Sequence, residues 1–554
     1  MGPEKGGAPW TPGTVEVLLR QALEKLDHAR PGELSVSRAV REEWGEFSSS
    51  ALLRSKRTGA EFGELATRLC EALLLEWPGT VQIREGRLNF HMSEASIRDA
   101  LEQATREGTH YGAGEALAGQ RILVEFVSTD PTGPLPFTAG RGAAVGEALA
   151  RLLVLQGARV TREFYLNDAT TSSKVKLLGE SVAAWVGEAF GLPAARTEGI
   201  LDDAFVRGVA AELSRREGHR LLALTPEERL TLCSRAALEA AVNSQRATLE
   251  QFGVRFDEWV SERELTRTGR VEKLLRDFRE QGLVEEREGA LWLVSSRFGD
   301  DADRPLVREN GELTYLTGDI AYHLWKAERG FDICLDLWTP EHQPYVQRTK
   351  AALRAAGAEV ERFEFLICQG AALKRDGVPL RLGISGGMLV LEEELKELDR
   401  DTLKFLFLQT EMKRIAEVDL ETARRDDESN PAYAVRLTPA RLGRLLREAQ
   451  AHLGPAPEAR QFAAEWASAE RTLARLVVLW PAEAETAALR RDPARVARFA
   501  LELATAVRDL GRLYGPVSDL GLAPLSDRVV LLRAAAIVVA NVLRSLGLEP
   551  DDRF

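Results

Sequence analysis

One stretch, residues 121–168, constrains the fold more than any other part of the sequence. It begins with the apolar run RILVEFV, as expected for a buried strand, and continues into a loop rich in Pro and Gly. We predict that Gly140-Arg141-Gly142 opens an alanine-rich helix over 143–155, and that ARVTREFYLND forms the next strand. A strand–helix–strand unit of this length favours a parallel sheet with a right-handed crossover. Ligands of such sheets bind beyond the carboxyl ends of the strands.

The 554 residues leave room for roughly three domains. We predict an α+β domain at 1–118, with helices in TVEVLLRQALEKL and ELATRLCEALLLEW and a hairpin in VQIREGRLNFHM. An α/β domain follows at 119–430, with a mostly helical insertion at 177–278 and later strands at 289–296, 313–320, 331–338 and 362–370. Helical periodicity predicts a helix bundle at 431–554. The predicted fold class is therefore a multi-domain α/β protein with a terminal helix bundle.

Composition excludes several classes of protein. No apolar run approaches about 20 residues, and the N-terminus has no basic region followed by an apolar one, so we expect a cytoplasmic protein with no membrane contact. The four cysteines form no CxxC pair and the histidines show no ligand spacing, so we expect reduced thiols and no metal site. The net charge of −12 argues against indiscriminate nucleic-acid binding, and no DNA partner is expected.

The charge is distributed unevenly along the chain. Residues 431–554 carry 17 Arg, no Lys and 14 Asp or Glu. A nearly neutral, arginine-only domain on an acidic body fits local binding of an RNA, and it equally fits a solvated helical surface. Charge alone leaves both interpretations open.

The loop that follows the first strand lacks the residues that its position in the fold leads one to expect. A strand, a Gly-containing turn and a helix N-terminus form the usual layout of a site for nucleotide phosphate. However, the loop reads PLPFTAG, with no histidine and no lysine to meet a phosphate.

At this point the motifs converge on a family. The chain resembles class I arginyl-tRNA synthetases over essentially its whole length, in GRLNFHM, VEFVSTDPTGPL with GRGAAVGEALARLL, EFYLNDA, VRFDEWVSERELTRTGRVEKLL, GALWLVSSRFGDDADRPLVRENGELTYLTGDIAYHLWKAERGFD, DRDTLKFLFLQ and DPARVARFALELA. The resemblance implies a first domain that touches the elbow of a tRNA. It implies a Rossmann-type domain that makes arginyl-adenylate from arginine and ATP, and a helical domain that reads the anticodon.

The positions that would carry the phosphate chemistry depart from this family. Its His-x-Gly-His tetrad corresponds to Pro136, Phe137, Thr138 and Ala139, so both imidazoles are absent and a glycine has become a threonine. In the Lys-Met-Ser-Lys-type loop the first cation is Arg381, and the second falls at Ile384. Each preorganised group that meets transition-state charge is worth about 10²–10³ in rate, so a normal rate of arginine activation is not expected.

Further family positions surround the same expected crevice. Thr339 replaces a glycine of the family's Trp-Gly-Ala-Asp-His-His-Gly-Tyr segment. In FYLNDATTSS, Thr170 and Ser172 stand at the family's Gly and Gln positions. Glu341 keeps a carboxylate for a ribose hydroxyl. If a nucleotide binds at all, we expect it to contact Gly140, Glu341 and Arg381.

The amino-acid half of the site is better kept. The resemblance places the arginine contacts at Glu125, Asp130, Tyr315, Asp319 and His342, where Asp130 stands in place of the usual asparagine. Asp130 fits pairing with an α-ammonium, and it also fits repulsion of an α-carboxylate. Each residue has a purely structural alternative: an internal partner for Glu125, a Tyr315–Asp319 pair, and a surface position for His342. For Arg141 the alternative is a local cap.

Three functions follow as hypotheses. The first is an arginyl-tRNA synthetase-like protein that is defective or strongly impaired in arginine activation and requires no cofactor. It binds L-arginine or a guanidino analogue, with a tRNA as a further candidate partner. The second is an active arginine–tRNA ligase that uses ATP and Mg²⁺ with Arg381, Arg141 or Lys374 in place of the missing cations. The third is a protein-interaction module without a ligand. We expect a monomer.

Overall fold

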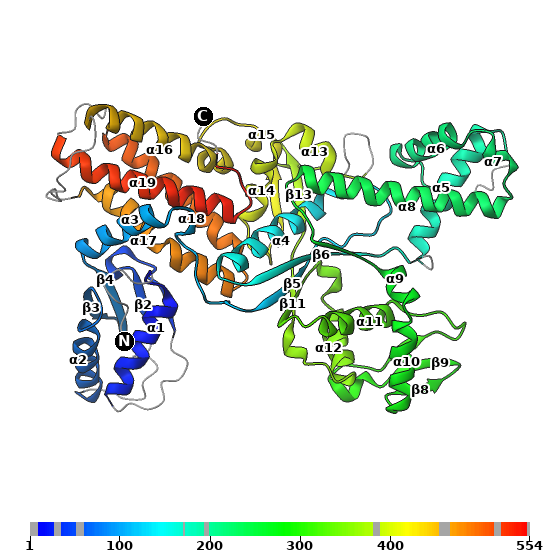
Figure 1. The fold of residues 1–554 in the computed structure, drawn as a ribbon, viewed down its shortest axis with the longest axis horizontal. Helices are drawn as coiled ribbons and strands as arrows, with labels where there is room; N and C mark the ends of the chain where they lie inside the picture. Colours follow the sequence, from blue (N-terminus) through cyan, green and yellow to red (C-terminus); the bar gives the residue numbers. More distant parts are fainter. Residues whose placement is uncertain are drawn as a thin grey trace. The chain divides into compact units, whose positions relative to one another are not determined.

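The computed structural model describes residues 9–26, 35–50, 60–169, 172–192, 199–380, 388–453, 466–514 and 522–550. The chain forms two compact units (Figure 1). The first unit combines residues 1–118, 151–157 and 425–554, and the second combines 119–150 and 158–424. The division into three domains at 118 and 430 stays a prediction.

An antiparallel sheet of order β1-β2-β4-β3 lies in the N-terminal part of the first unit. Its strands are β1 (Val36–Arg38), β2 (Phe47–Ser49), β3 (Gly79–Arg84) and β4 (Arg87–Met92). The predicted hairpin is confirmed: Glu85 and Gly86 both have positive φ, 52° and 72°, as a two-residue turn of this twist requires. The predicted helices are α1 (Pro12–Lys25) and α2 (Ala60–Leu74), and α3 (Glu94–Glu107) follows the sheet.

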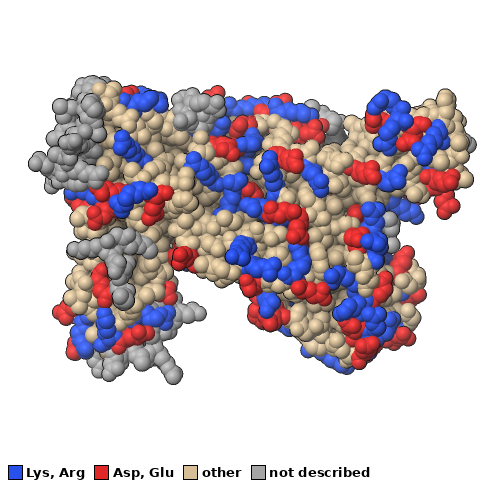
Figure 2. All heavy atoms as spheres, viewed as in Figure 1, with Lys and Arg blue, Asp and Glu red and all other residues tan. Residues whose placement is uncertain are grey.

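The predicted terminal bundle is also confirmed, as α16 (Pro431–Leu453), α17 (Ser468–Leu489), α18 (Pro493–Tyr514) and α19 (Leu522–Ser545). Its arginines include several that pair with acids of the same unit, such as Arg495 with Glu483 and Arg528 with Glu470. Figure 2 shows acidic and basic side chains interspersed over the face that it draws. Part of the arginine content of this region is therefore explained by internal ion pairs.

A parallel five-stranded sheet of order β12-β11-β5-β6-β7 organises the second unit. Its strands are β5 (Arg121–Glu125), β6 (Arg159–Leu166), β7 (Glu258–Ser261), β11 (Ile333–Trp338) and β12 (Phe363–Ile367). From β5 the chain first adds β6 and β7 on one side, and later β11 and β12 on the other. The strand order therefore reverses between β5 and β11, and the carboxyl ends of these strands are where a ligand is expected.

The helical insertion is confirmed. It consists of α5 (Ser173–Ala189), α6 (Ala204–Glu217), α7 (Arg220–Ala223) and α8 (Pro226–Gln251), which lie together in Figure 1. They share a core that includes Leu178, Val182, Val206, Leu213 and Cys233. The strand β7 was not predicted, because it has only four residues and just one of them is buried.

Two sequence predictions are wrong. The helix α4 (Phe137–Leu155) begins at Phe137 and not after Gly142. Gly140 lies inside its first turns, where a Cβ would meet the Leu391 side chain at 2.9 Å, so close packing explains the glycine at this position. Residues 313–320 do not form a strand: α11 (Tyr315–Glu328) begins there, because Leu316 and Ile320, one helical turn apart, pack into a core with Leu274.

The predicted strand at 289–296 exists as β9 (Ala290–Leu293), but it belongs to a separate antiparallel sheet of order β10-β9-β8. The remaining described elements are α9 (Glu262–Arg267), α10 (Arg270–Glu280), β8 (Val284–Arg287), β10 (Arg304–Val307), α12 (Tyr345–Ala355), β13 (Ala371–Arg375), β14 (Val378–Pro379), α13 (Leu391–Glu397), α14 (Arg400–Leu408), β15 (Ala416–Asp419), α15 (Leu420–Ala423), and 3₁₀ turns at Glu42–Trp44, Gly108–His110, Ser295–Phe298, Pro340–His342 and Val360–Arg362. Among the described helices, none is long and apolar enough to cross a membrane.

Candidate ligand site at the carboxyl ends of the parallel strands

The backbone turns sharply where β5 ends. Val127 and Ser128 have φ values of 70° and 41°, which are strained for residues with a Cβ and cost about 1–3 kcal/mol each. The Ser128 hydroxyl donates to Glu125 Oε1 at 2.8 Å and accepts the Tyr165 backbone N–H at 3.1 Å. These bonds fix the turn against the end of β6.

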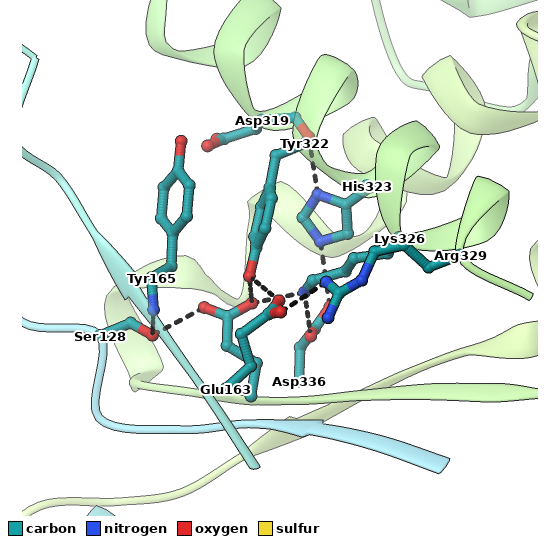
Figure 3. A network of polar contacts seen from close by, with 10 residues as sticks. Ser128, Glu163, Tyr165, Asp319, Tyr322, His323, Lys326, Arg329 and Asp336 are labelled. Atoms are coloured by element: carbon teal, nitrogen blue, oxygen red, sulfur yellow. Dashed lines mark hydrogen bonds and ion pairs between the residues drawn. The ribbon is translucent and has the colours of Figure 1, made fainter. Parts of the chain in front are cut away.

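A buried charge network lies beneath this turn (Figure 3). Lys326 of α11 is fully buried, and its Nζ lies 2.5 Å from Glu125 Oε2 and 2.6 Å from Asp336 Oδ1. Burial lowers the pKa of Lys326, but the Asp336 and Glu125 carboxylates outweigh burial and raise it. Burial raises the pKa of Asp336, but Lys326 and His323 together outweigh burial and hold the pKa well below its usual range. Lys326 and Asp336 are therefore both charged at neutral pH.

His323 completes one side of the network. Its Nδ1 lies 2.7 Å from the Asp319 carbonyl oxygen, and its Nε2 lies 3.0 Å from Asp336 Oδ2. A carbonyl and a carboxylate are both acceptors, so both ring nitrogens of His323 lie against acceptor oxygens. On the other side, Tyr322 donates to Glu163 Oε1 at 2.6 Å, and Glu163 also pairs with Arg329.

These contacts give Glu125 an internal role. Both of its oxygens have partners within the protein: Ser128 on one, and Lys326 and Tyr322 on the other. This is the structural alternative raised for Glu125 from the sequence, and its contact with a ligand stays a prediction.

Two carboxylates above the network have no cationic partner. Glu262 begins α9 and Asp319 lies in α11; within the described ranges, neither side chain forms an ion pair, and we call them the acidic pair. Burial, with the charges of Asp319 and Asp168, raises the pKa of Glu262 to about 7. A hydrogen bond from the Ala169 N–H acts in the opposite direction and lowers this pKa. Burial also raises the pKa of Asp319. Unbalanced negative charge of this kind is a marker of functional sites.

The hydroxyl of Tyr165 lies with the acidic pair. Tyr165 is 5% exposed and its ring stacks on Tyr322, with centroids 4.0 Å apart. Its hydroxyl has no hydrogen-bond partner in the described part of the chain, and Figure 3 shows it directed toward Asp319. Burial, together with the charges of Glu262 and Asp319, raises the pKa of this phenol. Two carboxylates and a phenol oxygen fit a planar cation such as a guanidinium.

The loop after the turn is held by the helical insertion. The fully buried amide of Gln245, from α8, donates to the carbonyl oxygens of Asp130 and Gly133, both at 3.0 Å. Asp130 also forms an ion pair with Lys174 of α5, with Nζ 2.5 Å from Oδ2. The side chains of Lys174 and Asp130 are 67% and 34% exposed. The loop carbonyls are thus fixed, while the ion pair lies at the surface.

The segment after β11 forms a hydrogen-bonded group of its own. The Thr339 hydroxyl donates to Glu341 Oε2 at 2.6 Å and lies 2.9 Å from His342 Nδ1. A hydroxyl has one proton to donate, so His342 Nδ1 is the donor of the second bond. Glu341 and His342 are exposed, which fits the surface alternative for His342. Tyr315, at the start of α11, is 64% exposed and forms no hydrogen bond with Asp319.

The start of α4 is apolar and tied down. Pro136 forms an antiparallel bridge with Val390, and the Phe137 N–H donates to the Leu389 carbonyl at 2.9 Å. The Phe137 ring is 1% exposed and packs on Phe407, while Thr138 is exposed and Ala139 partly buried. In its first turn, α4 therefore presents no cationic side chain.

The two described residues suggested as replacement cations are engaged elsewhere. Arg141 is fully buried and donates to the carbonyls of Gly370, Thr410, Glu411 and Arg414. Lys374 pairs with Glu417, with Nζ 2.7 Å from Oε2. Arg381 and Ile384 lie outside the described residues.

The structure places some of the residues named from the sequence at this edge of the sheet. Asp130 and Asp319 were named, whereas Glu262, Tyr165, Lys174 and Gln245 were not. Glu262 follows β7 directly, so recognition of that strand would have placed it at the same sheet edge. For Gln245, 112 or more residues distant from its partners, the local sequence carries no signal.

Comparison with protein families gives two matches. Residues 233–427 match the catalytic domain of class I tRNA synthetases of the arginine type, and residues 435–554 match the DALR anticodon binding domain.

Known proteins match over most of the chain. An arginine–tRNA ligase from Desulfosudis oleivorans is 34% identical over 84% of this chain and 84% of its own length. Another, from Carboxydothermus hydrogenoformans, is 33% identical over 98% of both chains.

Solved structures show the same fold. An arginyl-tRNA synthetase from Thermus thermophilus has a TM-score of 0.77 at 21% identity, covering 98% of this chain and 100% of its own. One from Plasmodium falciparum has a TM-score of 0.71 at 10% identity, covering 98% and 99%.

Proposed function

Because this chain belongs to the class I arginyl-tRNA synthetase family, we propose that it has kept the family's arginine-type ligand site and has lost most or all of its ability to activate arginine with ATP. The proposal concerns the chemistry of the second unit. In the cell we propose a cytoplasmic, monomeric protein whose helical C-terminal domain contacts a tRNA.

The observation that carries this proposal is that the side chains expected to meet a phosphate are either replaced or engaged with other groups. The first turn of α4 holds Pro136, Phe137, Thr138 and Ala139, where the family has its two histidines and a glycine. Arg141 donates hydrogen bonds to four carbonyls and Lys374 pairs with Glu417, so neither is available to a phosphate in this conformation. Negative charge that develops on a triphosphate would meet few fixed positive groups here.

The acidic pair supports the second half of the proposal. Glu262, Asp319 and Tyr165 offer two carboxylates and a phenol oxygen, and no described cation neutralises the carboxylates. A guanidinium supplies planar donors and a positive charge together, which fits this set of acceptors.

The test is ATP–pyrophosphate exchange with L-arginine and Mg²⁺, run beside the homologous ligase from Carboxydothermus hydrogenoformans. We expect the rate to be at least about 10³-fold lower, since several charge-stabilising groups are absent and their losses do not add fully. Exchange within tenfold of the relative would contradict the proposal and favour an active ligase with non-standard groups, with Arg381 as the remaining candidate cation.

A reversion separates a decayed enzyme from a remodelled one. The variant carries Pro136→His, Thr138→Gly, Ala139→His and Ile384→Lys. We expect exchange to rise by at least about tenfold, because each restored group meets transition-state charge. No gain would mean that the site around α4 has been rebuilt for another use. Calorimetry that detects no guanidino ligand at all would instead favour a pure interaction module.

A further inference from the structure

We propose that the outer edge of β12 binds an extended acidic peptide of a partner protein, which adds to the parallel sheet as a further strand. The inference goes beyond the proposed function, because it concerns the length of an edge strand and not the ligand site at the carboxyl ends of the strands. It holds whether or not the protein activates arginine.

The first argument is the unpaired backbone along this edge. β12 is the last strand on its side of the five-stranded sheet, and the Cys368 N–H that follows it donates to the Trp338 carbonyl of β11 at 2.8 Å. Because alternate residues of a strand direct their backbone groups to opposite sides, Phe365 and Ile367 direct theirs away from β11. No strand of the described chain pairs with them there. Their N–H and C=O groups are therefore a template for another strand.

The edge also lacks the features that usually protect an edge strand. β12 reads FEFLI, so it has a single charged residue and no proline. Its register with β11 is continuous, without a bulge, and its last four residues are partly exposed. Edge strands are commonly blunted by charges, proline or bulges, so an edge without them is suited to pairing.

A hollow of about 400 Å³ follows this edge. Its wall includes Phe365 and Leu366, neighbours whose side chains point to opposite faces of the sheet, together with Lys350 and Arg354 of α12. A hollow lined from both faces lies at the edge itself. It offers room for the side chains of an added strand, which is how sheet edges recognise extended peptides.

The cations of this wall select an acidic peptide. Lys350 Nζ lies 5.8 Å from the centre of the Phe365 ring, and Arg354 donates to the Phe298 carbonyl at 3.2 Å. Within the described residues, neither cation forms an ion pair. A carboxylate that arrives with the peptide therefore meets two cations that no internal carboxylate neutralises.

Two carboxylates of the same wall favour a peptide over a nucleic acid. Glu361 and Glu364 line the hollow beside the cations. A chain of phosphates would meet these negative charges as well as the positive ones. A peptide can place an acidic side chain at the cations and a neutral one at the carboxylates.

The experiment is fluorescence anisotropy of a dye-labelled peptide, acetyl-Thr-Val-Glu-Val-Glu-Val-Thr-amide, titrated with the full-length protein. In an extended peptide the two glutamates lie on one face. We expect this peptide to bind at least about tenfold more tightly than the same peptide with lysines in place of the glutamates, because the cations attract one and repel the other. Equal affinity for the two peptides would overturn the role of the cations.

Pairing through the backbone has a readout of its own. N-methylation of the central valine and N-methylation of a glutamate beside it remove N–H groups that point to opposite sides of the peptide. One of these forms should lose at least about tenfold in affinity, while the other binds as the parent peptide does. Equal affinity of the two forms would show that the peptide does not pair with the edge, and would overturn the proposal.

Matched variants assign the charge selectivity to residues. In the double variant Lys350→Gln with Arg354→Gln, the affinity for the acidic peptide falls about tenfold, since two exposed ion pairs are lost. A peptide with glutamines in place of the glutamates should bind the double variant and the wild-type protein equally. The control is Arg362→Gln, because Arg362 precedes the strand, pairs with Glu359 at 2.7 Å and is not part of the wall. We expect the control to bind both peptides as the wild-type protein does.

The failures are distinguishable. Unchanged affinity for the acidic peptide in the double variant, with a normal melting curve, overturns the selection by charge. If the double variant melts early, Lys350→Gln alone replaces it, with an expected loss of about threefold. A short single-stranded RNA that displaces the peptide from the wild-type protein, and does not bind the double variant, would overturn the choice of a peptide and assign the hollow to a nucleic acid.

Discussion

At the level of single residues, the environment of the Glu262 carboxyl determines how ligand binding at the whole site depends on pH. It lies among negative charges with no described cation beside it, and its pKa of about 7 follows from burial and from Asp319 and Asp168. A cationic ligand binds the ionised form, so binding must release a proton when the pH is below 7.

We therefore predict that the affinity for L-arginine falls by about tenfold for each pH unit below 7, and levels off above it. Calorimetry at pH 5.5 to 8.5, in buffers of different ionisation enthalpy, measures both the affinity and the proton release. Glu262→Gln should bind weakly with no such dependence. The control Glu264→Gln lies on the same helix, where Glu264 pairs with Arg267 in solvent. A flat profile for the wild-type protein would contradict the prediction.

At the level of elements, the start of α4 is held in place by the buried side chain of Arg141, in addition to its contacts with Leu389 and Val390. Arg141 donates to Gly370, between β12 and β13, and to three carbonyls between α14 and β15. One guanidinium thus satisfies backbone groups from two connecting segments. Burial lowers the pKa of Arg141, and the carbonyl dipoles stabilise its charge in place of water.

We predict that Arg141→Met lowers the free energy of unfolding by about 3–5 kcal/mol, because four backbone carbonyls lose their buried donor. Urea denaturation followed by circular dichroism measures the change. The control is Arg159→Met, since Arg159 is exposed at the start of β6, and it should cost less than about 1 kcal/mol. Equal effects of the two variants would show that Arg141 is not a structural tie.

At the level of the whole molecule, the first unit combines segments from both ends of the chain. Arg475 of α17 donates from Nε to Glu46 Oε1 and from Nη2 to the Gly45 carbonyl, both at 2.8 Å. Glu46 is 4% exposed and also accepts the Met92 N–H at 2.6 Å. The N-terminal sheet and the terminal helices of this unit therefore share a buried ion pair.

We predict that Arg475→Met weakens the first unit selectively, because it leaves a buried carboxylate without its cation, at a cost of about 3–5 kcal/mol. Hydrogen exchange should accelerate by at least about 10² in β2 and β4, and remain unchanged in β5. The exposed Arg490, replaced by Met, is the control. Faster exchange in β5 as well would mean that the two units unfold together.

The sequence alone determined the parallel sheet, the helical insertion, the hairpin at Glu85-Gly86 and the terminal bundle. Each of these rests on local periodicity or turn chemistry, which a short stretch carries in full. It also located the replaced residues Pro136 to Ala139, because a motif is a local pattern. From the sequence, the start of α4 was predicted too late in the chain, and the first turns of α11 were predicted as a strand. In both places packing overrides local propensity.

Only the tertiary structure decided what the charged residues do. Glu125 pairs with Lys326, 201 residues away along the chain. Arg141 donates to carbonyls more than 220 residues away. Glu262 lies near Asp319 because it follows β7, a strand too short to predict. The physical reason is that a charge is neutralised by whichever partner the fold brings near, and sequence distance does not enter that energy.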